Sequence, residues 1–191
     1  AKLKQGESML PLLVSGMWLN AIPSAQRGAR EREELGISDG NPGQTFTLRQ
    51  KPVLAGESIE IQEWVGNGEG WRTTLEDVPE DDRRLMRDPV SQKVTSVWVT
   101  WRSQTHLYNS SANDRHYTIE RATGLIRFGD NHNGLLPRAG SRIVAIYSSG
   151  GGMAGNVPVN AITELRSAMP YIQSATNPVP ASGGAEIESN D

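Results

Sequence analysis

The chain has 191 residues, with 19 lysines and arginines against 22 aspartates and glutamates, and no cysteine. This length is enough for one domain with a buried core. The net charge of -3 gives no overall attraction to nucleic acid or to an anionic membrane, and the lack of cysteine excludes disulfides, thiolate metal sites and cysteine nucleophiles.

Two stretches stand out before the first clear strand. The apolar run Met9–Leu19 superficially resembles a signal peptide, but Pro11 and Gly16 interrupt it. It is also shorter than the ~20 residues that span a bilayer as a helix, so we expect a strand or a buried lead-in. The chain starts with alanine, which favours a processed protein or a segment of a longer one. Arginines and glutamates alternate in Arg27–Leu35, which we expect to be a solvated stretch.

Alternation of apolar and polar side chains predicts strands through the middle of the chain. In Ser96–Ser103, residues Val97, Val99 and Trp101 share one face, while Trp98 lies on the other. Two further runs, separated by Ala-Thr-Gly, predict a hairpin with positive φ at Gly124. All the other predicted strands, including the two of this hairpin, are Thr45–Gln50, Ser58–Val65, Tyr117–Arg121, Leu125–Gly129 and Arg142–Ser149.

Helical signal is sparse. Pro79–Met86 is acidic first and basic last, which suits a short helix because it matches the helix dipole. A second helical or irregular segment is possible over Asn160–Met169, where Asn160 is a candidate cap. The tail from Asn177 is rich in proline, glycine and acidic residues, which predicts an extended or mobile arm.

A glycine-rich segment follows the last predicted strand. Gly150, Gly152 and Gly155 have the G-x-G-x-x-G spacing of dinucleotide-binding loops. Such a loop opens a helix, whereas Asn156–Val159 contains a proline and two β-branched residues where the first helical turn belongs. We therefore expect a bent backbone around Met153 that allows close passage between β-segments, with no anion cradle.

Three other patterns are weak candidates for chemistry. Gly36–Gly40 fits the G-x-S-x-G elbow around Ser38, but a strand and a helix do not flank it, so a surface turn is expected. The segment Gly129–Gly134 offers Asp130 and His132 but fails the spacing of a calcium loop, and we expect a turn. Acidic residues lie close together in polar stretches, where we expect solvated charge rather than acid/base catalysis; they are Glu31, Glu33, Glu34, Asp81 and Asp82.

The five tryptophans allow two interpretations. On a β-sandwich, exposed indole faces stack on sugars, whereas buried ones pack in a core or in a protein interface. Trp101 shares its face with Val97 and Val99 and is expected in the core. Trp98 points the other way, and we expect another layer or a partner to cover it.

Several strings taken together resemble the baseplate J-like, or putative baseplate assembly, proteins of contractile-tailed phages and related injection systems. They are LGISDGNPGQTFTLRQKPVL at 35–54, the 45 residues from Asp114 to Pro158, and NPVPASGGAEIES at 177–189. The order of F-G-D, G-x-x-P, G-G-G-x-x-G-N-V and N-P-x-P-A-x-G-G carries the resemblance. It covers most of the chain from Leu35 onward, while the turn Asn131–Asn133 is more polar than the family pattern.

The expected fold is mainly β, an antiparallel sandwich-like or mixed β domain with one or two short helices and an extended C-terminal arm. The expected division is an N-terminal lead-in over residues 1–34, a β-rich domain over 35–175 and an extended or mobile arm over 176–191. No catalytic, cofactor or metal residues are predicted. The residues predicted to contact partners are Trp98, Asn177, Pro178, Gly183 and Gly184.

The resemblance implies a baseplate wedge scaffold that links the hub and tube to the sheath and fibres, without catalysis or cofactor. Its implied partners are other baseplate, hub and sheath proteins, in several copies of a symmetric assembly, with no nucleic acid and no direct membrane insertion. It implies a location in a virion tail baseplate or an extracellular contractile particle, assembled in the bacterial cytoplasm. The alternative is a sugar- or receptor-binding β-sandwich of a tail fibre or surface protein.

Overall fold

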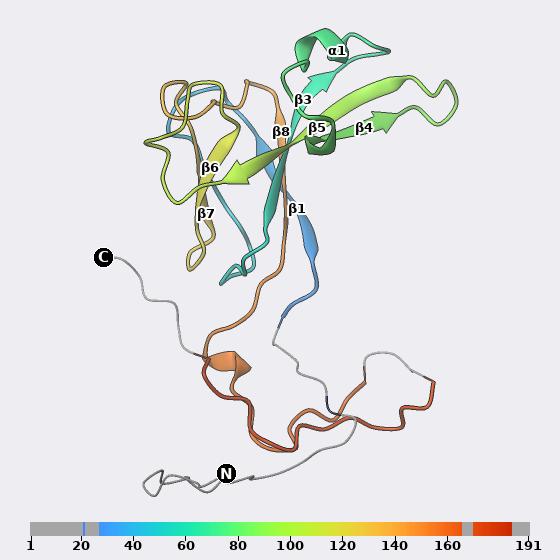
Figure 1. Ribbon diagram of the computed structural model, residues 1–191, viewed down its shortest axis with the longest axis vertical. Helices are drawn as coiled ribbons and strands as arrows, with labels where there is room; N and C mark the ends of the chain where they lie inside the picture. The colour runs from blue at the N-terminus through green and yellow to red at the C-terminus, as the bar shows by residue number, and fades with distance from the viewer. Residues whose placement is uncertain (1–20, 22–26, 166–169, 185–191) are drawn as a thin grey trace, which may run out of the picture.

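The computed structural model describes residue 21, residues 27–165 and residues 170–184. The described part contains eight strands in one sheet (Figure 1). Their bounds are β1 (Glu31–Ile37), β2 (Thr45–Thr47), β3 (Ser58–Val65), β4 (Arg83–Arg87), β5 (Val94–Ser103), β6 (His116–Glu120), β7 (Leu125–Phe128) and β8 (Arg142–Tyr147). The helices are short: α1 (Trp71–Thr74) and the 3-10 turns η1 (Glu80–Asp82) and η2 (Met153–Gly155).

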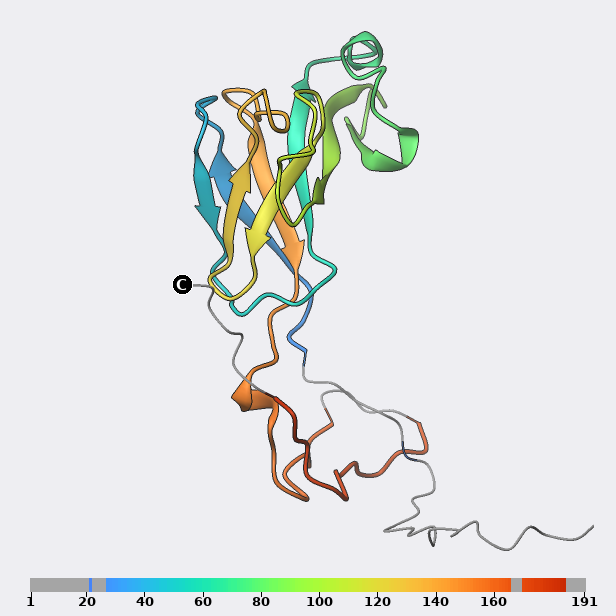
Figure 2. The ribbon, with the colours of Figure 1, turned by 60° about the vertical axis from the view of Figure 1, so that its left-hand side comes forward.

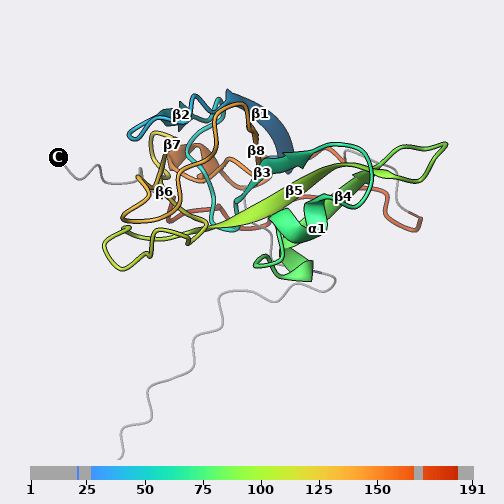
Figure 3. The same cartoon turned by 90° about the horizontal axis from the view of Figure 1, so that it is seen from above.

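The sheet curls into a nearly closed barrel. The strand order is β1-β8-β3-β5-β6-β7-β2, and β4 forms an additional pair with β5. All pairs are antiparallel except β5 with β6. Seen from above, β1 and β2, the two ends of this strand order, lie on the same side of the barrel (Figure 3). The two strands are close there, because a Cβ added at Gly36 in β1 would lie 3.5 Å from the ring of Phe46 in β2. The predicted mainly β, mixed fold is thus confirmed.

The core fills the barrel with the faces that the alternation predicted. Val97 and Val99 are fully buried, and Trp101 is 2% exposed. The Trp101 ring meets Phe128 edge-on with centroids 5.4 Å apart, an arrangement that aromatic pairs favour. The predicted hairpin is also confirmed, because β6 pairs with β7 and Gly124 has φ 71°.

One local prediction was incomplete and another was wrong. Arg27–Leu35 is mostly exposed, as expected of a solvated stretch, but β1 begins within it at Glu31 and pairs with β8. Pro79–Met86 does not form one helix: the three residues of η1 give way to strand β4, which pairs with β5 while Leu85 packs on the core. In both places the sheet partner supplies hydrogen bonds that local helix or coil preferences do not.

Several expectations fall wholly or partly outside the described residues. Met9–Leu19 lies outside them, and so do residues 166–169 of the possible helix over Asn160–Met169; its described part, 160–165, is not helical. In the part of the chain that is described, no helix has the length and hydropathy required to cross a bilayer. The division into lead-in, domain and arm stays a prediction, although β1 begins four residues before residue 35.

The segment after β8 leaves the barrel and forms a separate loop below it (Figures 1 and 2). The backbone runs from Tyr147 at the end of β8 through η2 and returns along itself towards residue 184. We call residues 156–184 the strap, of which 156–165 and 170–184 are described. The β4–β5 hairpin projects near the opposite end of the molecule (Figures 1 and 2).

Candidate functional site

Trp98 lies on the outer face of β5 under two arginines of its own chain. The guanidinium carbons of Arg32 in β1 and Arg84 in β4 lie 5.6 and 5.4 Å from its ring centroid. The indole is consequently only 8% exposed. Cation–π contacts of this kind stabilise by ~0.5–1 kcal/mol each at partly exposed sites. Stacking of Trp98 on a sugar therefore requires both arginines to move first.

Glu60 on β3 holds these two arginines in place. Its carboxylate accepts hydrogen bonds from Arg32 at 2.9 Å and from Arg84 at 2.5 Å. Burial favours a raised pKa for Glu60, but the hydrogen bonds from the two arginines outweigh it and bring the pKa below the ordinary value. Three strands are thereby joined across the outer face. Beside the indole is an open hollow of about 300 Å³, lined by Arg32, Glu34, Trp98, Arg142 and Val144.

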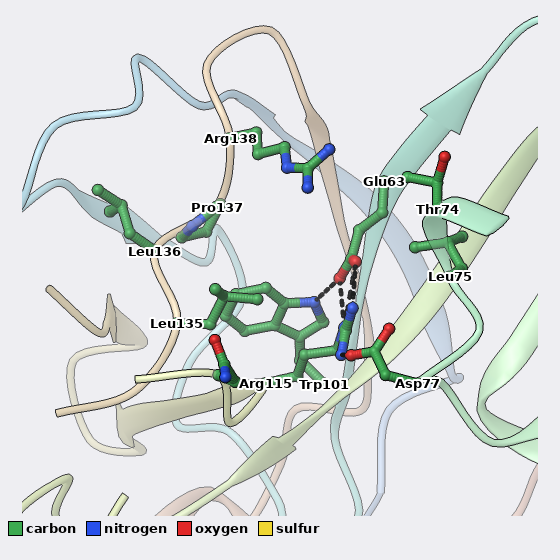
Figure 4. A pocket seen from close by; sticks show the side chains of 11 residues that line it. Glu63, Thr74, Leu75, Asp77, Trp101, Arg115, Leu135, Leu136, Pro137 and Arg138 are labelled. Carbon is green, nitrogen blue, oxygen red and sulfur yellow. Dashed lines mark hydrogen bonds and ion pairs between the residues drawn. The ribbon is translucent and has the colours of Figure 1, made fainter. Parts of the chain in front are cut away.

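A second charged cluster lies at the rim of a small cavity (Figure 4). Arg115 donates two-pronged hydrogen bonds to Glu63 on β3 at 3.0–3.1 Å and a further one to Asp77 at 2.7 Å. The indole nitrogen of Trp101 donates to the same Glu63 at 2.7 Å. The cavity measures about 160 Å³ and is lined by Glu63, Thr74, Leu75, Asp77, Trp101, Asn113, Arg115, Leu135, Leu136, Pro137 and Arg138.

One cation, Arg115, is shared between the two carboxylates of this cluster. The hydrogen bond from Arg115 lowers the pKa of Asp77, and the bonds to Glu63 and Asp77 raise that of Arg115 although burial opposes it. Both oxygens of Glu63 are engaged by Arg115, and one also accepts from Trp101. The geometry therefore ties β3, β5 and the residues before β6 together, and it leaves Glu63 poorly placed to act as a base.

Ser38 of the G-x-S-x-G pattern is a buried structural residue. Its hydroxyl donates to the Pro137 carbonyl at 2.8 Å. It also accepts from Gly40 N at 3.1 Å and from the Gln44 side-chain nitrogen at 2.9 Å. The residue is 3% exposed, so the hydroxyl has neither access nor a neighbouring base. The expected surface turn is wrong at this position, because strand β1 runs to Ile37 and Ser38 directly after it is buried; the elbow still fails, since the residues between Ser38 and β2 form no helix.

The segment Gly129–Gly134 is likewise a turn held by its own side chains. Asp130 accepts the backbone N–H groups of His132 at 2.9 Å and Asn133 at 2.8 Å. These bonds lower the pKa of the Asp130 carboxyl. Among the described residues, no group of three or more His, Asp or Glu side chains is arranged to hold a metal ion.

The glycine-rich segment after β8 bends without opening an α-helix. Gly150, Gly151 and Gly152 have φ of 150°, 85° and 67°, a region that side-chain-bearing residues rarely adopt. The short turn η2 follows, and Asn156 returns to extended backbone. Between Gly155 and residue 165 the described chain has no helix. The expectation of a bent turn in place of a phosphate-binding helix start is confirmed.

Four of the predicted contact residues lie in the strap, where two of them hold the chain together. Asn177 donates to the Pro158 carbonyl at 2.8 Å and to that of Val179 at 3.0 Å, and its side-chain oxygen accepts from Ile162 N at 2.9 Å. Val157 and Ala181 exchange backbone hydrogen bonds at 3.2 and 3.0 Å. The two arms of the strap are therefore paired like a short hairpin.

Gly184 closes the other end of this pairing. It exchanges two hydrogen bonds of 2.8 Å with the side-chain amide of Asn156. A Cβ at Gly184 would lie 2.3 Å from the Gly152 carbonyl oxygen, a distance that no side chain tolerates. Pro178 and Gly183 are exposed neighbours in the same segment. The structure thus brings together the four strap residues but leaves Trp98 apart on the barrel, and their role in partner contacts stays a prediction.

Sequence reasoning missed the residues that organise both charged clusters. Glu60 and Arg84 are 24 residues apart, and Glu63 and Arg115 are 52 apart. One signal was present for Glu60, because it alternates with the buried Ile59 and Ile61 and must therefore face outward, as Trp98 does. Nothing comparable pointed to Arg115.

The described residues form a small β-barrel whose charged clusters hold its own strands together and from which a paired strap extends. Residues 121–184 match the model of the Baseplate J-like protein barrel domain. The match confirms the resemblance to baseplate J-like proteins and supports a structural role in a phage baseplate. The matched segment contains β7, β8, η2 and the strap up to Gly184. No curated protein and no solved structure shows significant similarity to the chain.

Proposed function

We propose that this chain is a wedge scaffold of a contractile tail or injection-system baseplate, which links the hub and tube to the sheath and fibres without catalysis. The match over residues 121–184 carries this proposal, because it includes both a wall of the barrel and the strap. In this proposal the chain lies in the baseplate of a virion tail or of an extracellular contractile particle. The particle is assembled in the bacterial cytoplasm and contains several copies of the chain.

The strap supports a scaffolding role because it displays apolar side chains away from the barrel core. Tyr171 is fully exposed, and four further apolar residues of the strap are between 42% and 49% exposed: Val159, Ile162, Ile172 and Val179. Contiguous exposed apolar surface marks interaction sites in proteins that assemble. The predicted contacts at Asn177, Pro178, Gly183 and Gly184 then fall into two kinds: Asn177 and Gly184 shape the strap, and Pro178 and Gly183 lie on its surface.

The charged clusters support the absence of catalysis in this proposal. The side chains with the strongest chemistry, Glu60, Glu63 and Ser38, are each hydrogen-bonded to residues that join strands or loops. A general base or nucleophile needs a free position that faces a substrate. The alternative sugar-binding role finds no support at Trp98, because Arg32 and Arg84 cover its ring.

Complementation in the native particle tests the proposal. Deletion of the gene should leave particles without complete baseplates in electron micrographs, and the wild-type chain should restore them. The double variant Tyr171→Ser/Ile172→Ser should fail to restore them and should lose co-purifying hub and sheath subunits. Tyr108→Ser is the matched control, because Tyr108 is 83% exposed on a barrel loop.

Two results would contradict the proposal. One is normal baseplates after gene deletion. The other is turnover of a glycan, an ester or a nucleotide by the purified chain that Ser38→Ala or Asp130→Ala abolishes.

A further inference from the structure

The chain contains two Asn-Gly pairs, Asn67-Gly68 and Asn133-Gly134, which the structure places in different hydrogen-bond settings. In such a pair the glycine nitrogen can attack the asparagine carboxamide, because glycine has no side chain to hinder the approach. Both asparagines are exposed, and neither carboxamide is hydrogen-bonded to a described residue. By sequence and exposure the two pairs are therefore equal candidates for spontaneous deamidation.

The N–H group of the glycine distinguishes the two pairs. That of Gly68 donates to the Val94 carbonyl at 3.0 Å, which ties this turn to the start of β5. Within the described part of the chain, the N–H of Gly134 donates no hydrogen bond. The attacking species is the deprotonated nitrogen, so a hydrogen bond from the N–H has to break before attack. Only the pair at Asn67 has such a bond to lose.

The turn around Asn133 is held on both sides of the reacting atoms. The N–H of Asn133 donates to the Asp130 carboxylate at 2.8 Å, and the Gly134 carbonyl accepts from the N–H of Asn131 at 3.0 Å. The Asn133 carboxamide and the Gly134 nitrogen lie between these two bonds and take part in neither. Gly134 is buried, but attack takes place within the pair, and water has to reach only Asn133, which is exposed.

We propose that the folded chain deamidates at Asn133 and that its structure protects Asn67. The Gly134 nitrogen forms a bond to Cγ of Asn133 while the carboxamide C–N bond breaks, and the proton of the Gly134 nitrogen leaves with the amine as ammonia. Water then opens the resulting succinimide at either of its two carbonyls, which gives aspartate or isoaspartate. The net reaction exchanges a neutral amide for a carboxylate and needs water alone.

Either product disturbs a tightly packed turn. A Cβ at Gly129 would lie 2.1 Å from the Gly134 oxygen, so the two ends of the turn touch backbone to backbone. Both products place a second carboxylate beside Asp130, and isoaspartate also adds a methylene to the backbone. The next residue, Leu135, packs against the barrel core. We expect the Leu135 amide to exchange its hydrogen faster in the deamidated chain, while the amides of β3 and β5 keep their protection.

Peptide mapping by mass spectrometry measures both pairs in one sample. The full chain is incubated at mildly alkaline pH, and the aspartate and isoaspartate peptides from positions 67 and 133 are quantified over time. Asn133 should react roughly three- to tenfold faster than Asn67, which is the factor that one hydrogen bond supplies. In guanidinium chloride, where the bond from Gly68 to Val94 is lost, the two rates should become similar.

Asn133→Ser assigns the product, because it should abolish the signal from position 133 and leave that from Asn67 unchanged. Equal rates in the folded chain, or a faster reaction at Asn67, overturn the proposal. A difference that persists in guanidinium chloride does so as well, since the cause would then be the neighbouring residues rather than the fold. The reaction takes place within one chain, so its failure leaves the proposed baseplate role standing.

Discussion

Arg115→Leu removes the cation that joins β3, β5 and the turn after α1, and we expect it to destabilise the barrel strongly. The substitution deletes the two-pronged bond to Glu63 and the bond to Asp77. Leucine retains much of the buried aliphatic volume, so loss of packing is small. The main consequence is that Glu63, whose side chain is 12% exposed, keeps its charge with Trp101 as its main remaining donor.

The size of the effect follows from that stranded carboxylate. Removing one partner of a buried ion pair costs about 3–5 kcal/mol. Arg115 and Glu63 keep some contact with water, and Trp101 still donates to Glu63, so we expect the lower end, about 3 kcal/mol. For a chain of this length that loss lowers the melting temperature by roughly 6–12 °C.

Urea unfolding followed by tryptophan fluorescence measures the change, with Arg142→Leu as the matched control. Arg142 forms a similar two-pronged pair with Glu34, but both side chains are about half exposed, so its removal should shift the unfolding midpoint much less. Glu63→Gln added to Arg115→Leu should recover part of the loss, because it removes the stranded charge. Equal shifts for Arg115→Leu and Arg142→Leu, or no recovery in the double variant, would refute the reasoning.

Three further predictions concern single hydrogen-bonded groups. Ser38→Ala should lower the free energy of unfolding by about 1–3 kcal/mol, measured in urea, because the Pro137, Gly40 and Gln44 groups lose their partner in a buried site; an unchanged midpoint would contradict this. Gly184→Ala should speed proteolysis within the strap, since its Cβ would lie 2.3 Å from the Gly152 oxygen, and should leave the barrel's circular dichroism unchanged. The control Gly70→Ala, whose Cβ would have its nearest contact at 3.7 Å, should not speed this proteolysis. Burial and the hydrogen bond to Glu33 raise the pKa of Tyr147 to about 12. The native state therefore holds the phenol proton more tightly than the unfolded chain does, and the free energy of unfolding should fall as pH rises from about 10 through 12. Tyr147→Phe should flatten the stability profile over that range, and an equally steep fall in urea midpoint would count against this assignment.

Strands that bury one face were predictable because the alternation of side chains is itself the requirement for burial. Ile59 and Ile61 in β3, and Val97 and Val99 in β5, are all fully buried, as the period of two indicated. The hairpin at Gly124 was predictable for a similar local reason, since a tight turn needs a residue that accepts positive φ.

Elements whose partners are remote were not predictable. The residues of β1 were expected only as a solvated stretch, because most of them are charged, and the pairing with β8 makes them a strand. The residues of β4 were expected to form the basic end of a helix, since three of the five are arginines. They form a strand instead, because β5 supplies partners for their backbone hydrogen bonds. In both cases the local sequence leaves the backbone undecided, and long-range hydrogen bonds settle it.

The candidate sites divide in the same way. The turns at Asp130 and Gly152 could be recognised from neighbouring residues, because the bonds of Asp130 and the φ values of the glycines are local properties. The setting of Ser38 could not, because it follows strand β1 and its bond to Pro137 spans 99 residues. The sequence also did not indicate that arginines from two other strands cover Trp98, although it did indicate that Trp98 lies on the outer face.

The sequence by itself determined a β-rich chain, the inward faces of its central strands, the bend at Gly150–Gly152 and the resemblance to baseplate J-like proteins, all of which depend on residues close together or on ordered motifs. Only the tertiary structure decided that the sheet curls into a nearly closed barrel, that Glu60 and Glu63 bind arginines from other strands, and that the strap folds back on Asn156. The physical reason is that charge pairs and strand edges are satisfied by whichever partner the fold brings near, and a partner 24 or 52 residues away leaves no periodic trace in the sequence.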